Sequence, residues 1–292
     1  MRILINKEQI DFSLEDEKNL GEVINELQLW LEKSRMTIDS LNINGKKAVP
    51  EEIETWNTRS IDEISEIDIE AKLNSEIEAE KLGAAFVAFK QLREGIDSGD
   101  VERTAQAAAE IVDSESIPYK ILFDITGEEG LNSAKEIIER EGLISGNIPE
   151  GEEKTKTLTF ADNVLKIITG RAKELAYPLR EASAAAGILK GMIPRLNEVS
   201  VYLQTGRDEE AMNLIIRFAE LTQKLLRLLP HIGSGEKGQI NEEFARNLND
   251  KLNEVVGAFH DQDSILLGDL MEYEITPCIE ELLTYFLPVE KG

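Results

Sequence analysis

The sequence predicts an α+β protein that is mostly helical, with a small strand-containing domain followed by a helical region that ends in an antiparallel helical bundle. Two patterns and the composition support this prediction. Apolar residues alternate with polar ones only within the first 72 residues, and a period of two is typical of strands. After residue 72 they recur almost everywhere at the spacing of one helix face. Hydrophobic residues make up 41% of the 292 residues, which is enough for the cores of about two domains.

The first half of the N-terminal domain is expected to contain two strands and a helix. Alternating apolar residues mark a strand over residues 1–6 and a second over 10–14, with a turn between them at 7–9. Five apolar residues at helical spacing then predict a helix over 20–34.

The second half of this domain is expected to contain three strands. Apolar residues over 38–43 come directly before Asn44-Gly45, a pair that favours a two-residue hairpin because both residues tolerate positive φ. A short strand after the hairpin and a last strand over 64–69 complete the domain. The predicted order is therefore strand, strand, helix, strand, strand, strand.

This order of elements over residues 1–72 resembles the β-grasp fold of ubiquitin-like and sulfur-carrier proteins. The resemblance implies a module that docks other proteins. Those families act through a free C-terminal Gly-Gly, whereas here the last strand continues through 71–74 into a helix. A role as a covalent carrier is therefore not expected.

The rest of the chain is divided by a change of composition. The expected parts are a helical segment over 73–142, a linker over 143–157 and the helical bundle over 158–292. Two glycines and a proline interrupt the helical periodicity of the linker. The last helix is expected over 264–286, with a bend at Pro277, because proline cannot donate the helical hydrogen bond.

The charge of the chain excludes two classes of partner. There are 32 Lys and Arg against 57 Asp and Glu, a net charge of −25. Such a field repels phosphate backbones and anionic membrane surfaces, so neither nucleic acid nor a membrane is expected as a partner. Residues 163–230 are basic, with 10 cationic and 7 acidic side chains. We expect this stretch to face an acidic one, within the chain or in a second copy.

Cysteine and histidine are scarce. Cys278 is the one cysteine, which excludes an intramolecular disulfide and a cysteine-rich zinc site. His231 and His260 are the two histidines. The N-terminus has no long apolar targeting segment, and no apolar run is long enough to span a membrane. We therefore expect a cytoplasmic protein without a bound cofactor.

Two short motifs suggest chemistry that the surrounding sequence does not support. Residues 233–238 match G-x-G-x-x-G, but a helix precedes them instead of the strand that a dinucleotide site requires. His231 and the pair His260-Asp261 resemble the metal ligands of HD-type phosphohydrolases, but a distant final aspartate is missing. The first motif is interpreted as a loop between helices, and no metal site is expected.

The last helix carries the candidate site residues. Asp269, Glu272 and Tyr273 share one face by their spacing. Paired carboxylates are suited to general acid–base work, to ion pairs across the bundle or to a solvated face, and all three interpretations remain open. The candidate cationic partners are the arginines Arg195, Arg217 and Arg227.

The sequence favours a non-enzymatic adaptor or scaffold that binds proteins through an acidic helical surface. Catalytic residues are not identified, and the six candidate residues are assigned to partner binding. One alternative is an enzyme or small-ligand binder that uses carboxylates of the bundle, which predicts a deep pocket near Asp269 and Glu272 and a raised carboxyl pKa. A second alternative is a homo-oligomeric structural protein.

Overall fold

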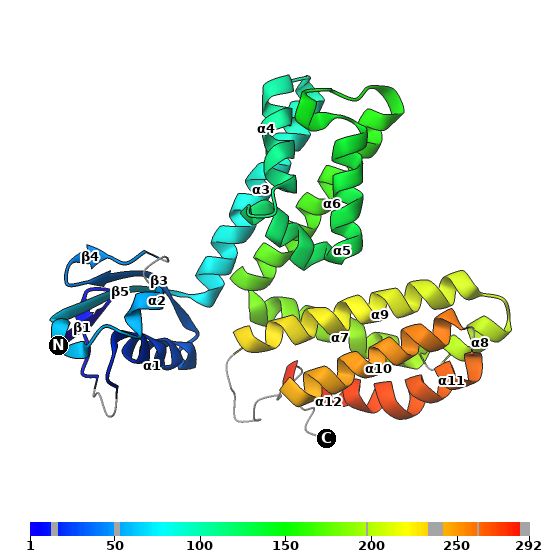
Figure 1. Cartoon of the computed structure of the whole chain (residues 1–292). Coiled ribbons are helices and arrows are strands. Elements are labelled where there is room, and N and C mark those ends of the chain that lie inside the picture. Colours follow the sequence, from blue (N-terminus) through cyan, green and yellow to red (C-terminus); the bar gives the residue numbers. More distant parts are fainter. Residues whose placement is uncertain (13–16, 50–52, 197, 233–241, 262, 287–292) are drawn as a thin grey trace. The chain divides into compact units, whose positions relative to one another are not determined.

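The computed structural model describes residues 1–12, 17–49, 53–196, 198–232, 242–261 and 263–286. The chain divides into two compact units, Met1–Ile168 and Thr169–Gly292. The first contains a small sheet and a group of helices, and the second contains helices only (Figure 1). The protein is α+β and mostly α, as the sequence predicts.

The N-terminal sheet has five strands in the order β2-β1-β5-β3-β4. The strands are β1 (Arg2–Ile5), β2 (Glu8–Gln9), β3 (Met36–Ile43), β4 (Lys46–Lys47) and β5 (Glu66–Leu73). β1 and β5 are parallel, and the other neighbours are antiparallel. Helix α1 (Leu20–Lys33) packs its apolar face on the sheet, and two short helical turns follow, α2 (Ile53–Trp56) and η2 (Ile61–Glu63). Sheet and helix share one apolar core.

The first turn differs from the prediction. It lies at Asn6 and Lys7, which have φ of 51° and 70°, so β2 consists of Glu8 and Gln9. Residues 10–12 are therefore not in a strand, contrary to the predicted strand over 10–14, whose residues 13 and 14 lie outside the described residues. The reason is that two successive residues with positive φ close the tightest hairpin, and the amide side chain of Asn6 is fixed by hydrogen bonds with the backbone N–H and C=O of Ala71 at 2.9 and 3.0 Å.

The predicted hairpin at Asn44-Gly45 is confirmed. These residues have φ of 51° and 77° and connect β3 to β4. The side chain of Asn44 also reaches across the sheet. Its Oδ1 accepts hydrogen bonds from the backbone N–H of Ser65 at 2.8 Å and of Glu66 at 3.1 Å, and its Nδ2 donates to the carbonyl of Glu63 at 3.0 Å. The turn thereby holds the start of β5.

The helices of the first unit begin and end where the sequence has caps. They are α3 (Asn74–Ser98), α4 (Val101–Val112), α5 (Ile117–Arg140), the 3₁₀ turn η3 (Leu143–Ser145) and α6 (Gly151–Ala176). Gly99 ends α3 with φ of 75°, and the carboxylate of Asp100 caps α4. Gly127, with φ of 69°, interrupts α5. The rings of Phe89 on α3 and Phe160 on α6 meet edge to face at 6.3 Å.

The expected linker is largely helical. Within residues 143–157 lie η3 and the first turns of α6, which begins at Gly151, seven residues before the predicted helix start at 158. Only Gly146 and the residues after it up to 150 lie outside these helices. The division between the two compact units falls inside α6, after Ile168.

The second unit is a helical bundle around one apolar core. After the end of α6, its elements are α7 (Pro178–Leu196), α8 (Val199–Gln204), α9 (Asp208–Leu228), η4 (Leu229–His231), α10 (Glu242–His260), α11 (Ser264–Asp269), η5 (Leu270–Ile275) and α12 (Thr276–Phe286). α9 and α10 run antiparallel (Figure 1). The largest fully buried side chain of this core is Phe218.

The last helix is irregular before Pro277 and not at it. Residues Leu270–Ile275 form a π-helical segment, and α12 begins at Thr276. Proline lacks an N–H, and its ring excludes the carbonyl four residues earlier. In the π-type turn, both the N–H and the hydroxyl of Thr276 donate to the carbonyl of Met271, five residues earlier.

Candidate functional site

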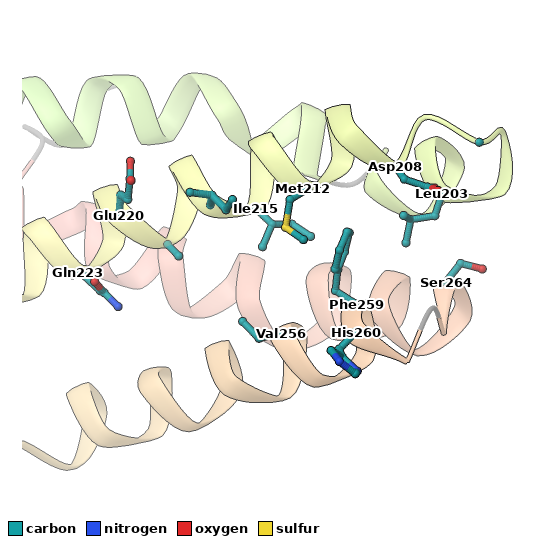
Figure 2. A pocket seen from close by; sticks show the side chains of 13 residues that line it. Leu203, Asp208, Met212, Ile215, Glu220, Gln223, Val256, Phe259, His260 and Ser264 are labelled. Atoms are coloured by element: carbon teal, nitrogen blue, oxygen red, sulfur yellow. The ribbon is translucent and has the colours of Figure 1, made fainter. Parts of the chain in front are cut away.

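A groove runs along the second unit between α9 and α10 (Figure 2). Its volume is about 780 Å³. Helix α9 contributes the apolar side chains Met212, Ile215, Ile216 and Ala219, and α10 contributes Val256 and Phe259. Leu203 of α8 and Ser264 of α11 lie at one end. We call this feature the α9/α10 groove.

The groove exists because each helix carries apolar residues beyond those that fill the core. Ile215 is 5% exposed, but its neighbour Ile216 is 46% exposed; Val255 is 1% exposed, but Val256 is 57% exposed. Ile215 and Val255 pack in the core, where Ile215 also borders the groove, and Ile216 and Val256 are exposed in the groove, since successive residues on a helix point about 100° apart. The groove is therefore an open apolar surface and not an enclosed cavity.

The lining of α9 follows one helix face. Met212, Ile216, Ala219 and Gln223 recur at spacings of three and four residues. From Met212 to Gln223 the helix rises about 16 Å. Figure 2 shows Met212 and Ile215 facing Phe259 across the gap. The groove has the length of about three turns of a helix.

The polar groups of the groove are acidic or neutral. Asp208 lies at the end near α8, and Glu220 lies further along α9. None of the thirteen lining residues is Lys or Arg. The side chain of His260 is exposed, and its Nδ1 lies 3.5 Å from a carboxylate oxygen of Asp261. Across the described residues, no three His, Cys, Asp or Glu side chains are grouped as metal ligands would be.

A second hollow lies on the other side of α9, towards α7. Its volume is about 510 Å³, and Arg195 and Arg217 both line it, together with Asn213 and Glu210. Glu210 is paired with Arg207, and this hydrogen bond is the main cause of the lowered pKa of Glu210. The structure thus brings together two of the three predicted arginines.

The third predicted arginine belongs to a buried charge cluster. Arg227 lines a neighbouring hollow with Arg217 and Lys224. Its Nε lies 3.5 Å from a carboxylate oxygen of Glu174, and Lys224 lies 3.7 Å from the same carboxylate. Burial raises the pKa of Glu174 despite these cations.

The predicted carboxylates of the last helix lie elsewhere. Asp269 ends α11, and Glu272 and Tyr273 lie on η5; all three are exposed. Within the ranges that the structure describes, they form no ion pair with the three arginines, and none of them lines the three hollows described above. On this helix the ion pair is formed by Glu274, with Lys251 of α10.

Two family models match the chain, one in each unit. One, described as the TP0873 N-terminal domain, matches residues 1–72. The other, described as a domain of unknown function (DUF8042), matches residues 182–285. An uncharacterized protein of Treponema pallidum (strain Nichols) is 25% identical over 139 residues, which are 45% of this chain and 68% of that protein. No solved structure is significantly similar to the chain.

The matched ranges bear on the groove. All of its lining residues, from Leu203 to Ser264, lie within the second match. The groove is therefore part of the matched domain, and the descriptions of the similar proteins name no activity. Among the described helices, none combines the length and the apolar character needed to cross a membrane.

The sequence analysis did not identify the groove residues. The signal that distinguishes them is the adjacent apolar pair, Ile215-Ile216 on one helix and Val255-Val256 on the other, because one narrow core-facing stripe has no place for both members. The G-x-G-x-x-G motif at 233–238 lies outside the described residues.

Proposed function

We propose that this protein is a non-enzymatic adaptor whose second unit binds a helix of a partner protein in the α9/α10 groove. The observation that carries the proposal is the exposed apolar lining. Met212, Ile216 and Val256 are 39%, 46% and 57% exposed. Contiguous apolar surface on a folded unit marks a site of interaction. An amphipathic helix binds in such a groove by inserting the apolar residues that recur along it at spacings of three and four.

The open shape favours a protein partner over a small ligand. A volume of about 780 Å³ lies within the range of small-molecule sites, but such sites enclose most of the ligand surface. Here the side chains on both walls remain exposed to solvent. A helix lying along the groove covers both walls at once and brings its own polar face to the outside.

The position of the carboxylates favours binding over acid–base catalysis. Asp269 and Glu272 are exposed on the last helix and do not line the groove. The carboxyl group with the raised pKa is that of Glu174, which is engaged with Lys224 and Arg227. A general acid must instead be accessible to its substrate.

Two further surfaces belong to the proposal. Along the chain of the N-terminal domain two strands precede α1 and three follow it, and we propose that this domain is a ubiquitin-like module that docks a second protein. β5 continues directly into α3 at Asn74, so this docking is non-covalent. Arg195 and Arg217 in the second hollow, and the exposed Asp269, Glu272 and Tyr273, are further candidate contacts.

Site-specific photo-crosslinking tests the groove. A photoreactive phenylalanine derivative is placed at Val256 and, as a control, at Leu179, which is 67% exposed on α7 and outside the groove. We expect the full-length protein to crosslink a distinct protein from position 256 and not from position 179. The additional change Ile216→Glu places a charge on the opposite wall and is expected to abolish this product.

Two outcomes contradict the adaptor. Equal crosslinking from positions 256 and 179 means that the groove has no specific partner. A product from position 256 that consists of two copies of this chain supports the homo-oligomer instead. Mass spectrometry of the product distinguishes these outcomes.

A further inference from the structure

The α9/α10 groove is lined by two acidic side chains and by no Lys or Arg among the described residues. The acidic residues are Asp208 and Glu220, which both lie on α9. Among the charged residues next to the lining in sequence, Glu209, Asp261 and Asp263 are acidic. The neighbouring cations are engaged elsewhere, since Arg207 is paired with Glu210, Lys224 is paired with Glu181, and Arg217 lines the hollow towards α7. An apolar groove with an acidic rim is complementary to an apolar face bordered by cations.

The C-terminal stretch that includes α10 adds to this field, whereas residues 163–230, which include α9, contain 10 basic and 7 acidic side chains. Residues 241–292 contain 12 acidic and 3 basic side chains. Lys251 is paired with Glu274 and does not line the groove. Charges of one sign over an apolar surface raise the local concentration of oppositely charged partners, within about 8 Å of the surface at physiological salt.

The spacing of the rim charges sets the spacing of their partners. Asp208 and Glu220 are twelve residues apart on α9, which corresponds to a rise of about 18 Å. On a helix lying along the groove, residues about eleven positions apart return to the same face after three turns. Two cations at that spacing reach both acids, while the apolar residues between them face Ile216 and Val256.

We propose that the occupant of the groove is a basic amphipathic helix of another protein, with Lys or Arg residues that flank its apolar face and pair with Asp208 and Glu220. This inference rests on the proposed adaptor function and names the class of its partner. A second copy of this chain is disfavoured, because it brings a net charge of −25 against a rim of the same sign.

Two designed peptides test the inference with the full-length protein. Both are helices of about 18 residues, roughly 27 Å long, with the same leucine face. One has lysine on its polar face and the other has glutamate. Binding is followed by fluorescence anisotropy at low and at physiological salt. We expect the lysine peptide to bind more tightly, by about tenfold at low salt, with a smaller difference at physiological salt.

Two pairs of substitutions separate the rim from the net charge. Asp208→Lys with Glu220→Lys reverses the rim. Glu280→Lys with Glu281→Lys changes the net charge by the same amount on α12, where both side chains are exposed and neither lines the groove. The rim variant is expected to lose the preference for the lysine peptide, and the control variant is expected to keep it. Ile216→Glu is expected to weaken the binding of both peptides in the parent protein and in both double variants. Circular dichroism checks that each variant is folded.

Each remaining outcome overturns a different statement. If both peptides bind equally and Ile216→Glu weakens both, the basic partner is wrong and the helix-binding groove stands. If the rim and control variants lose the preference equally, the assignment to Asp208 and Glu220 is wrong. If Ile216→Glu changes the binding of neither peptide, or if neither peptide binds, the groove does not bind helices. The proposed function is then wrong as well.

Discussion

The ammonium nitrogen of Lys224 lies 3.7 Å from a carboxylate oxygen of Glu174, and Glu174 is the one charged residue that is buried among those described. The same ammonium donates a hydrogen bond to Glu181 at 2.6 Å. Lys224 therefore joins the end of α6 to the beginning of α7 through α9. A cation placed between two carboxylates attracts both, and this attraction offsets part of the cost of burying the Glu174 carboxylate.

Replacing this lysine is expected to destabilise the second unit. Lys224→Met keeps most of the aliphatic volume but leaves Glu174 with only its arginine partners and removes the hydrogen bond to Glu181. We expect a loss of about 1–3 kcal/mol in the free energy of unfolding at neutral pH. Urea denaturation measures it, and Lys166→Met, a change at an exposed lysine of α6, is the control. A change below about 0.5 kcal/mol contradicts a stabilising role for Lys224.

The two carboxylates respond to pH in opposite directions. Burial raises the pKa of Glu174, so the folded protein binds this proton more tightly than the unfolded chain does. Its contribution to stability therefore falls as the pH rises from the ordinary carboxyl pKa through the raised one. The hydrogen bond from Lys224 lowers the pKa of Glu181, so its contribution is present above the ordinary pKa and is lost as the pH falls through the lowered one.

Glu174→Gln isolates the first of these effects. The neutral amide avoids the desolvation that raises the pKa of Glu174, so we expect the variant to be more stable than the parent at pH 7. The difference is expected to shrink towards zero in acid, where Glu174 is protonated in both states. Thermal unfolding between pH 3 and pH 7, values that span the ordinary carboxyl pKa of about 4.3, measures it. A difference that grows on acidification has the wrong sign and refutes the assignment.

Two glycines of α3 are expected to respond oppositely to alanine. A Cβ at Gly95 would lie 2.5 Å from Oγ1 of Thr104 and 3.0 Å from its backbone nitrogen, so Gly95→Ala forces α3 and α4 apart at a cost of about 1–3 kcal/mol. A Cβ at Gly83 would meet nothing within 4 Å, so Gly83→Ala is expected to stabilise the helix by about 0.5–1 kcal/mol. Chemical denaturation of the two variants side by side tests the close approach, and equal effects would argue against it.

Asn44 is expected to matter for more than its turn. Asn44→Ala removes the hydrogen bonds to Glu63, Ser65 and Glu66 and places alanine at a positive φ. We expect a loss of about 2–3 kcal/mol. Asn44→Gly is the control, because it relieves the backbone strain but removes the same hydrogen bonds. If the glycine variant is as stable as the parent, the hydrogen bonds across the sheet contribute nothing.

The N-terminal domain shows which parts of the fold are local. The hairpin at Asn44-Gly45 and the helix over 20–33 follow from neighbouring residues, and both are predicted from the sequence alone. The hydrogen bonds from Asn44 to Ser65 and Glu66 join residues more than twenty positions apart, so no local pattern indicates them. The hairpin at Asn6-Lys7 was missed because lysine is not a typical residue at positive φ, and the bonds that hold Asn6 come from Ala71.

The second unit shows why sites are harder to predict than helices. The spacing of apolar residues predicts α9, but it does not say which neighbour covers each side of that helix. Arg195 and Arg217 meet in one hollow because α7 and α9 pack together. Asp269 and Glu272 face solvent, since η5 buries Leu270, Met271 and Ile275 instead. The spacing of residues along a helix shows which of them share a face, but it does not show which other helix packs against that face.

Neighbouring isoleucines of α9 offer a direct test of the open groove. Ile215 is 5% exposed and packs in the core, so Ile215→Ala is expected to lower the free energy of unfolding by about 2–4 kcal/mol. Ile216 is 46% exposed and lines the groove, so Ile216→Ala is expected to change it by less than about 0.5 kcal/mol. Urea denaturation of both variants measures this contrast. A large loss for Ile216→Ala would mean that Ile216 is covered within the chain itself, and the groove would then be closed to any partner.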